Sequence, residues 1–297
     1  HLEGAKFDGP IRAGGLRVDG KFAINNSHLH GVAFFDARID GDFSLSGCQI
    51  GQPAATESDE AAQPATKANF NSMSINGFAH FSGVKAHAFM NLSFIRVAFG
   101  VNAHQIFAHG LSLENATVDG PIRMSTATLD NPQGYALNVD HLTAKSDVSL
   151  GHLTATGAVS FGGSAIKGQL SLNGATLDAG NSEQPALNLY QSTVEGGVWM
   201  LTAHISADEH RPFSATGGVV LAEATLGTIS SDGATFTNPE RTALNGDGMT
   251  VERECALHDI DAQGALYFGD VSFRGPIKIS GTVRGKWTAL NLGGARC

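Results

Sequence analysis

Apolar side chains recur along almost the whole chain at steps of five or six residues. One such series runs through Ile24, Leu29, Phe34, Ile39, Leu45 and Ile50. A second apolar or small residue lies two positions before many of these, as Phe43, Cys48 and Leu170 do. Spacing of this kind does not match an amphipathic helix, which needs apolar residues at positions i, i+3, i+4 and i+7. Locally it is the period-two pattern of a very short strand with one buried face.

The sequence contains near-copies of one ten-residue segment, and stacking of these copies would stabilise such short strands. The phrase reads GQLSLNGATL at 168–177, and related versions begin at Gly110, Gly120, Gly157 and Gly264. A strand of two or three residues buries too little surface to offset its ordering entropy, so each one needs the next copy stacked on it. The pattern therefore predicts an all-β fold: one right-handed parallel β-helix over residues 1–297, with four short faces per coil and about twelve coils of about 21 residues.

Polar insertions interrupt the repeat at 51–67, 130–135, 178–185, 206–216 and 237–242. Four of them are followed by a similar restart, ANFN or ALN, so we expect all of the insertions to leave the same corner of the solenoid. Loops on a rigid scaffold usually carry specificity. The predicted binding residues are therefore those of two insertions, namely Asp178, Asn181, Glu183, Asp208, Glu209, His210 and Arg211. The restart asparagines are predicted to fix the turn by side-chain hydrogen bonds to the backbone; they are Asn71, Asn138, Asn188 and Asn245.

Charge and cysteine content narrow the functional classes. A net charge of −9 argues against a nucleic-acid partner, which requires a basic surface. Cys48 and Cys255 fall on the apolar register and are predicted to be unpaired core residues, which favours a cytoplasmic or membrane-associated location. No run of about 18 apolar residues is present, so no transmembrane segment is expected in this chain.

Catalytic and cofactor motifs are missing from the sequence. The glycines follow the coil spacing rather than a dinucleotide-binding pattern, and there is no phosphate-binding loop, no His-Glu-x-x-His motif and no Gly-x-Ser-x-Gly elbow. We therefore assign no catalytic residue, no cofactor and no metal. Histidines at near-repeat spacings leave a stacked imidazole site open as an alternative; the pairs are His28 and His30, His104 and His109, and His141 and His152.

The five-residue step resembles that of the pentapeptide-repeat proteins, which form quadrilateral β-helices. Segments such as GATFTNPERTALNGDGMTVERECAL (233–257) and GVVLAEATLGTISSDGATF (218–236) are more similar to long bacterial repeat proteins often labelled "membrane-associated oxidoreductase". That label implies a cofactor site, for which the sequence offers no residues. The resemblance covers nearly the whole chain and implies a fold rather than an activity.

Three functions are consistent with these features. The first is a non-enzymatic scaffold or binding module that presents its loops to a protein or glycan partner. The second is a glycan-processing lyase or hydrolase, whose acids would come from the loop insertions. The third is an acidic DNA mimic, which the pentapeptide resemblance implies. Because neither end reads as a cap, we also expect either a longer parent protein or end-to-end association.

Overall fold

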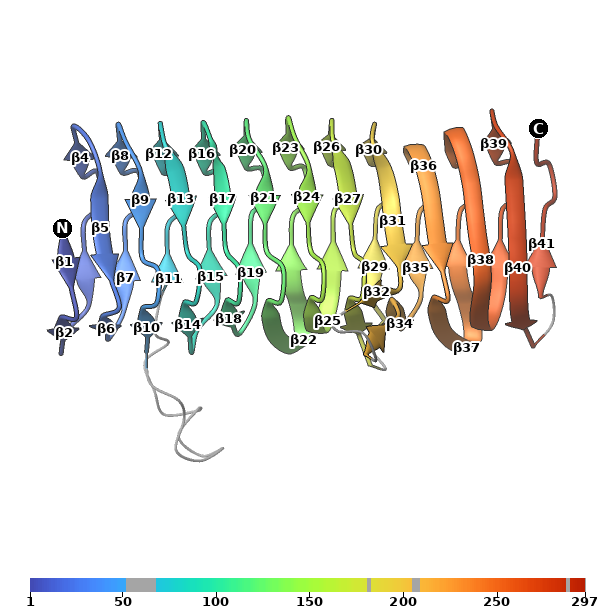
Figure 1. The fold of residues 1–297 in the computed structure, drawn as a ribbon, viewed down its shortest axis with the longest axis horizontal. Coiled ribbons are helices and arrows are strands. Elements are labelled where there is room, and N and C mark those ends of the chain that lie inside the picture. The colour runs from blue at the N-terminus through green and yellow to red at the C-terminus, as the bar shows by residue number, and fades with distance from the viewer. Residues whose placement is uncertain (52–67, 181–182, 205–208, 287–288, 297) are drawn as a thin grey trace.

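The computed structural model describes residues 1–297 except 52–67, 181–182, 205–208, 287–288 and 297. The chain is a parallel β-solenoid of about 12 turns of about 22 residues, and the described residues contain no helix. Figure 1 shows the coils stacked along one axis, with the two termini at opposite ends. The predicted all-β solenoid is confirmed.

Each coil crosses four faces, which we number 1 to 4 in chain order. Face 1 contains β1 (Leu2–Glu3), β5 (Phe22–Asn25), β9 (Phe43–Ser44), β13 (Phe78–His80), β17 (Gly100–Asn102), β21 (Ile122–Arg123), β24 (Val148–Ser149), β27 (Gln169–Ser171) and β31 (Gly197–Leu201). Face 2 contains β2 (Lys6–Phe7), β6 (His28–Leu29), β10 (Gln49–Ile50), β14 (Lys85–Ala86), β18 (Phe107–Ala108), β28 (Thr176–Asp178) and β34 (Ser214–Thr216).

Faces 3 and 4 complete the coil. Face 3 contains β3 (Ile11–Arg12), β7 (Val32–Ala33), β11 (Ala68–Asn69), β15 (Met90–Asn91), β19 (Leu111–Ser112), β29 (Leu187–Asn188), β35 (Val219–Val220) and β41 (Leu290–Asn291). Face 4 contains β4 (Arg17–Val18), β8 (Arg38–Ile39), β12 (Ser74–Ile75), β16 (Arg96–Val97), β20 (Thr117–Val118), β23 (Thr143–Ala144), β26 (Ala165–Ile166), β30 (Thr193–Val194) and β39 (Ser272–Phe273).

Longer strands bend around a corner and serve more than one face. β22 (Thr128–Asn138), β25 (Thr154–Ser160) and β37 (Thr235–Asn245) run from face 2 to face 3. β36 (Thr225–Asp232) joins faces 4 and 1, β38 (Thr250–Tyr267) crosses all four faces, and β40 (Ile277–Arg284) joins faces 1 and 2. A separate antiparallel hairpin pairs β32 (Ala203–His204) with β33 (His210–Arg211).

The coils pair in parallel with their neighbours, with register shifts confined to the long strands β22, β25, β36, β37, β38 and β40, and this alignment builds the core. Val101 pairs with Ala79 in the preceding coil and with Ile122 in the following one, so that like side chains stack in inward columns. The predicted apolar series from Ile24 to Ile50 is buried throughout. Phenylalanines form a continuous ladder in the first coils, where Phe34, Phe43, Phe70 and Phe81 are fully buried and their neighbouring ring centroids are 5.4 to 6.2 Å apart.

The corner between faces 3 and 4 is a column of left-handed residues. Most positions hold a small or polar residue, such as Asp36 (φ 55°), Asn115 (φ 56°) or Gly163 (φ 65°). Such residues tolerate this conformation because they are small or bond locally to the backbone. Phe94 (φ 60°) is the exception, because it is bulky and 52% of its surface is exposed.

Asparagines on face 3 close the turn that follows. Oδ1 of Asn138, Asn188 and Asn245 accepts a hydrogen bond from the backbone N–H two residues further on, at 3.1 Å in each case. The equivalent position in the 68–74 coil is Asn69, whose Oδ1 accepts from the N–H of Asn71. The register aligns Ala68 with Met90, which places Asn69 in the asparagine column. Asn71, which the ANFN restart suggested for this position, therefore lies two residues beyond the column.

The insertions leave two neighbouring corners rather than one. Segments 130–135, 178–185 and 237–242 follow a face 2 strand and precede a face 3 strand, and segment 51–67, mostly outside the described residues, connects β10 to β11. The fifth insertion lies instead between β31 on face 1 and β34 on face 2. Residues 214–216, assigned to this insertion from the sequence, form β34, an ordinary strand of face 2. The prediction of one shared corner was therefore wrong for this loop.

Cys48 and Cys255 are buried and free, as predicted. Burial, followed by the negative charge of Glu254, raises the pKa of Cys255 to about 12. Burial likewise raises the pKa of Cys48, despite an opposing hydrogen bond from the Ser27 backbone.

Both thiols should therefore resist alkylation in the folded protein, because the thiolate is the reactive form. At pH 8, iodoacetamide should modify Cys48 and Cys255 at least about tenfold more slowly in buffer than in urea. Peptide mapping by mass spectrometry measures both rates. Equal rates in buffer and urea would contradict the burial of these side chains.

Apolar side chains of the two end coils are partly exposed. Leu2 and Leu292 expose 48% and 47% of their surface, whereas the equivalent inner positions are buried. End-to-end association remains a prediction.

Candidate functional site

The corner between faces 2 and 3 carries most of the loops, and we call the described residues 130–135, 178–180, 183–185 and 237–242 the loop edge. Asp178 is exposed, and its Oδ1 accepts a hydrogen bond from the Gly180 N–H at 2.8 Å. Glu183 is exposed as well. Asn181, which was predicted with them, lies outside the described residues. The carboxylate of Asp178 thus shapes its own loop.

The 203–211 hairpin lies on the wall of face 2. Arg211 Nη2 donates to Oγ1 of both Thr154 and Thr176 at 2.8 Å, and Nη1 donates to the carbonyl of His152 at 3.4 Å. The predicted binding residue Arg211 therefore holds the hairpin against two neighbouring coils. Glu209 and His210 are exposed; Asp208 lies outside the described residues.

Arg211→Ala should release the hairpin without unfolding the solenoid. The substitution removes two charge-assisted hydrogen bonds to side chains, and these anchor a surface element only. Limited proteolysis should cleave the hairpin at least about fivefold faster, while the thermal midpoint changes little. Glu209→Ala, which removes an exposed neighbour, is the matched control and should leave the cleavage rate unchanged. A wild-type cleavage rate in Arg211→Ala would show that the hairpin is held by other contacts.

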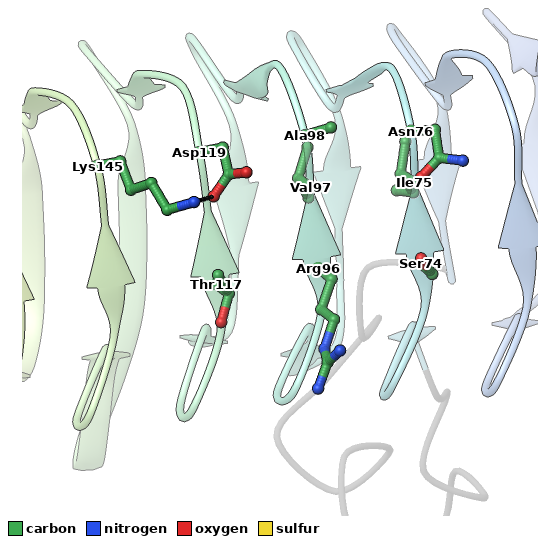
Figure 2. A pocket seen from close by; sticks show the side chains of 9 residues that line it. All are labelled: Ser74, Ile75, Asn76, Arg96, Val97, Ala98, Thr117, Asp119 and Lys145. Carbon is green, nitrogen blue, oxygen red and sulfur yellow. Dashed lines mark ion pairs between the residues drawn. The ribbon is translucent and has the colours of Figure 1, made fainter.

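Face 4 carries a shallow hollow of about 300 Å³, which we call the Arg96 hollow. Figure 2 shows its lining; the residues are Ser74, Ile75, Asn76, Arg96, Val97, Ala98, Thr117, Asp119 and Lys145. The strands β12, β16, β20 and β23 position these residues because each crosses face 4 in register with the next. The hollow lies opposite face 2 and away from the loop edge (Figure 1).

The hollow lies where the charge pattern of the first crossings of face 4 is lost, since the crossing at 74–76 reads Ser-Ile-Asn. Two earlier coils read Arg-x-Asp on this face, at 17–19 and 38–40, and Arg38 Nε donates to Asp40 Oδ1 at 2.9 Å. The equivalent segment in the 96–98 coil is Arg-Val-Ala, so the carboxylate is replaced by the methyl group of Ala98. Across the described residues, the Arg96 side chain has no hydrogen-bond or ion-pair partner, and it is exposed.

One wall of the hollow is an ion pair. Lys145 Nζ lies 2.8 Å from Asp119 Oδ1, and Figure 2 shows this side chain reaching back across β20. Because the lysine neutralises Asp119, Arg96 is the uncompensated charge of the hollow. No sequence pattern predicted this site. Its signal is Ala98, at a position where two earlier coils have Asp19 and Asp40.

Exposed phenylalanines stand at both ends of this coil's crossing of face 4. Phe94 precedes Arg96 by two residues, and Phe99 directly follows Ala98; 52% and 59% of their surfaces are exposed. Phe99 also contacts Phe78 on face 1, with ring centroids 5.8 Å apart.

The structure brings together two histidine pairs that differ from the predicted ones. His87 and His109 stack with Phe107 on face 2, with imidazole centroids 6.1 Å apart. Burial, then the positive charges of His109 and Lys85, lower the pKa of His87. His204 and His210 face each other across the hairpin, with centroids 4.5 Å apart.

Of the three histidine pairs predicted from spacing, His28 and His30 are both exposed on either side of buried Leu29, and the other two pairs are separated. His104 follows β17 on face 1, whereas His109 follows β18 on face 2, so the two point from different faces. His141 and His152 occupy two different corners. Within the described part of the chain, no three histidine, cysteine, aspartate or glutamate side chains are grouped to hold a metal.

No family model, curated protein or solved structure matches the chain. Among the described residues, no helix is long and apolar enough to cross a membrane. Functional inference therefore depends on the surfaces of the solenoid itself.

Proposed function

We propose that the chain is a non-enzymatic scaffold or binding module, a rigid solenoid that presents its loop edge to a protein or glycan partner. The supporting observation is the placement of the insertions: 130–135, 178–185 and 237–242 all leave one corner of the parallel ladder, and the strands on both sides of each insertion pair with the neighbouring coil. Loops held by a rigid framework are the usual carriers of specificity.

Two segments of the loop edge, 130–135 and 237–242, are each closed by a side-chain hydrogen bond. Asn131 Nδ2 donates to the Tyr135 carbonyl at 2.9 Å, and Asn238 Nδ2 donates to the Thr242 carbonyl at 3.0 Å. Each bond links residues four apart, so these two insertions are closed by the same device in coils far apart along the rod. Preformed loops lose less conformational entropy on binding than floppy ones.

Replacing loops tests the proposal directly. Residues 178–185 and 237–242 are exchanged for Gly-Ser segments of equal length, and the protein is applied to a glycan array and used to isolate partners from its native lysate. Binding that is lost with the loops supports the proposal. The control carries Arg123→Ser and Lys167→Ser, two exposed positions on faces 1 and 4, and should bind as wild type does.

Two outcomes would overturn the proposal. Partner binding that survives loop replacement would locate the interface elsewhere on the solenoid. Turnover of a bound glycan would favour the alternative of a carbohydrate-processing enzyme, with its acids among the loop residues.

A further inference from the structure

The coils around the Arg96 hollow differ in composition from the rest of the chain. Residues 68–113 contain no aspartate or glutamate, although the chain has 28 acidic residues and a net charge of −9. The same stretch contains the exposed side chains of Phe89, Phe94 and Phe99. An acidic protein thus has one section with exposed aromatic rings and a few cations but no acidic residue of its own, and Asp119 of the next coil is paired with Lys145. This combination suits an anionic, partly apolar partner.

Arg96 is unpaired because of the sequence and not because of the fold. Arg38 shows that an acid two residues later can reach an arginine in this column, and Asn76 Nδ2 also donates to Asp40 at 2.9 Å. At position 98, alanine removes that partner, and Figure 2 shows the exposed Arg96 side chain turned away from Ala98, toward the start of the strand. An arginine presents a rigid fork of donors that matches a carboxylate.

Phe94 places a large ring at a corner where other coils have a small or polar residue. The turn requires its φ of 60°, which is unfavourable for a bulky side chain, and its ring is largely exposed instead of packed in the core. The turn itself therefore does not explain why a phenylalanine stands there. Phe99, the most exposed of the large apolar side chains, stands at the other end of the same crossing.

We propose that the Arg96 hollow binds a short extended segment of a partner protein, in which one carboxylate side chain is flanked by aromatic or aliphatic side chains. The carboxylate pairs with the exposed Arg96 guanidinium. Hydroxyl and amide groups of Ser74, Thr117 and Asn76 line the hollow as further hydrogen-bonding groups. The flanking apolar side chains cover Phe94 and Phe99, which removes exposed aromatic surface from water. This site is independent of the loop edge.

The test measures fluorescence anisotropy with labelled five-residue peptides. The probes have a central glutamate flanked by two phenylalanines or two leucines, and matched probes have glutamine in place of glutamate. The acidic probes should bind saturably with Kd below about 1 mM, and the glutamine probes at least about tenfold more weakly. Absence of saturable binding by every acidic probe, or equal binding of the glutamine probes, overturns the proposal.

Three variants locate the site. Arg96→Gln removes the charge, and Ala98→Asp rebuilds the Arg-x-Asp pattern so that Arg96 gains an internal partner. Each should weaken the acidic probes at least about tenfold. Arg38→Gln is the matched control, because it changes the same charge in the same column at an arginine that is already paired, and it should bind as wild type does. Unchanged binding in Ala98→Asp would overturn the assignment.

Vesicles separate a protein partner from a membrane. If phosphatidylserine-containing vesicles bind in an Arg96-dependent manner and the peptides do not, the hollow is a lipid-binding surface and the proposal is wrong. Peptide binding that persists after replacement of loops 178–185 and 237–242 supports the hollow whatever the outcome for the loop edge, so failure of one proposal is distinguishable from failure of the other.

Discussion

Phe70→Ala is expected to lower the free energy of unfolding by about 3 to 5 kcal/mol. The ring is fully buried and lies 5.4 Å from that of Phe81, 6.0 Å from that of Phe43 and 6.2 Å from that of Phe34, centroid to centroid. Removing it breaks the aromatic ladder at its centre and leaves a cavity that the flanking coils cannot close, because their backbones are hydrogen-bonded on both sides. Urea unfolding followed by circular dichroism measures the loss.

Phe99→Ala provides the matched control for this experiment. It removes the same ring from a side chain that is 59% exposed, so its cost should stay below about 1 kcal/mol. Since coils in a solenoid depend on their neighbours, Phe70→Ala should also lower the cooperativity of unfolding around it. A loss of less than about 1 kcal/mol in Phe70→Ala would contradict the continuous ladder.

The core could be predicted from the sequence because its signal is local and repeated. Apolar residues at five- and six-residue steps specify which side chains point inward in every coil, and the buried series from Ile24 to Ile50 follows them. Coil length follows from the same pattern, since Val101 pairs with Ala79 and Ile122. Repetition across about 12 turns compensates for the weakness of each short strand as a signal.

Register across insertions was harder to predict. The ANFN restart suggested that Asn71 was equivalent to Asn138, but the structure aligns Asn69 with the asparagine column. The loop near 206 shows the same limit, because 214–216 reads as polar loop sequence yet pairs in register as β34. Serine, alanine and threonine suit both a loop and an outward-facing strand, so composition alone does not place the boundary.

The Arg96 hollow could not be predicted from the sequence for a different reason. Its walls come from coils separated by 21 to 26 residues, and Ala98 is notable only beside its structural neighbours Asn76 and Asp119. The offset between Asp40 and Asn76 is 36 residues, since an insertion intervenes. A missing side chain becomes visible once the column is aligned, and a sequence scan for reactive residues does not detect it.

Gly120→Ala is expected to destabilise the protein by about 3 kcal/mol, because two coils touch at that backbone. An added Cβ would lie 1.8 Å from the Phe99 carbonyl oxygen and 2.5 Å from its carbon, and both atoms belong to the backbone of the preceding coil. To accommodate a methyl group the coils must separate, which lengthens the bond from the Val101 N–H to the Pro121 carbonyl, now 3.0 Å. Gly9→Ala, where nothing lies within 4 Å of the added Cβ, is the control and should stay within about 0.5 kcal/mol of wild type in urea unfolding.

The same substitution links the core of the solenoid to the Arg96 hollow. Phe99 directly follows Ala98, which lines the hollow, so a displaced Phe99 carbonyl also moves that end of the hollow and the ring beside it. Gly120→Ala should therefore weaken binding of the acidic peptides in the absence of urea, where the protein is folded. Phe70→Ala, which changes the interior of the coil before that of Arg96, should weaken this binding less. Full peptide affinity in a destabilised Gly120→Ala protein would mean that the Phe99 ring contributes nothing to the hollow, and that Arg96 alone accounts for binding.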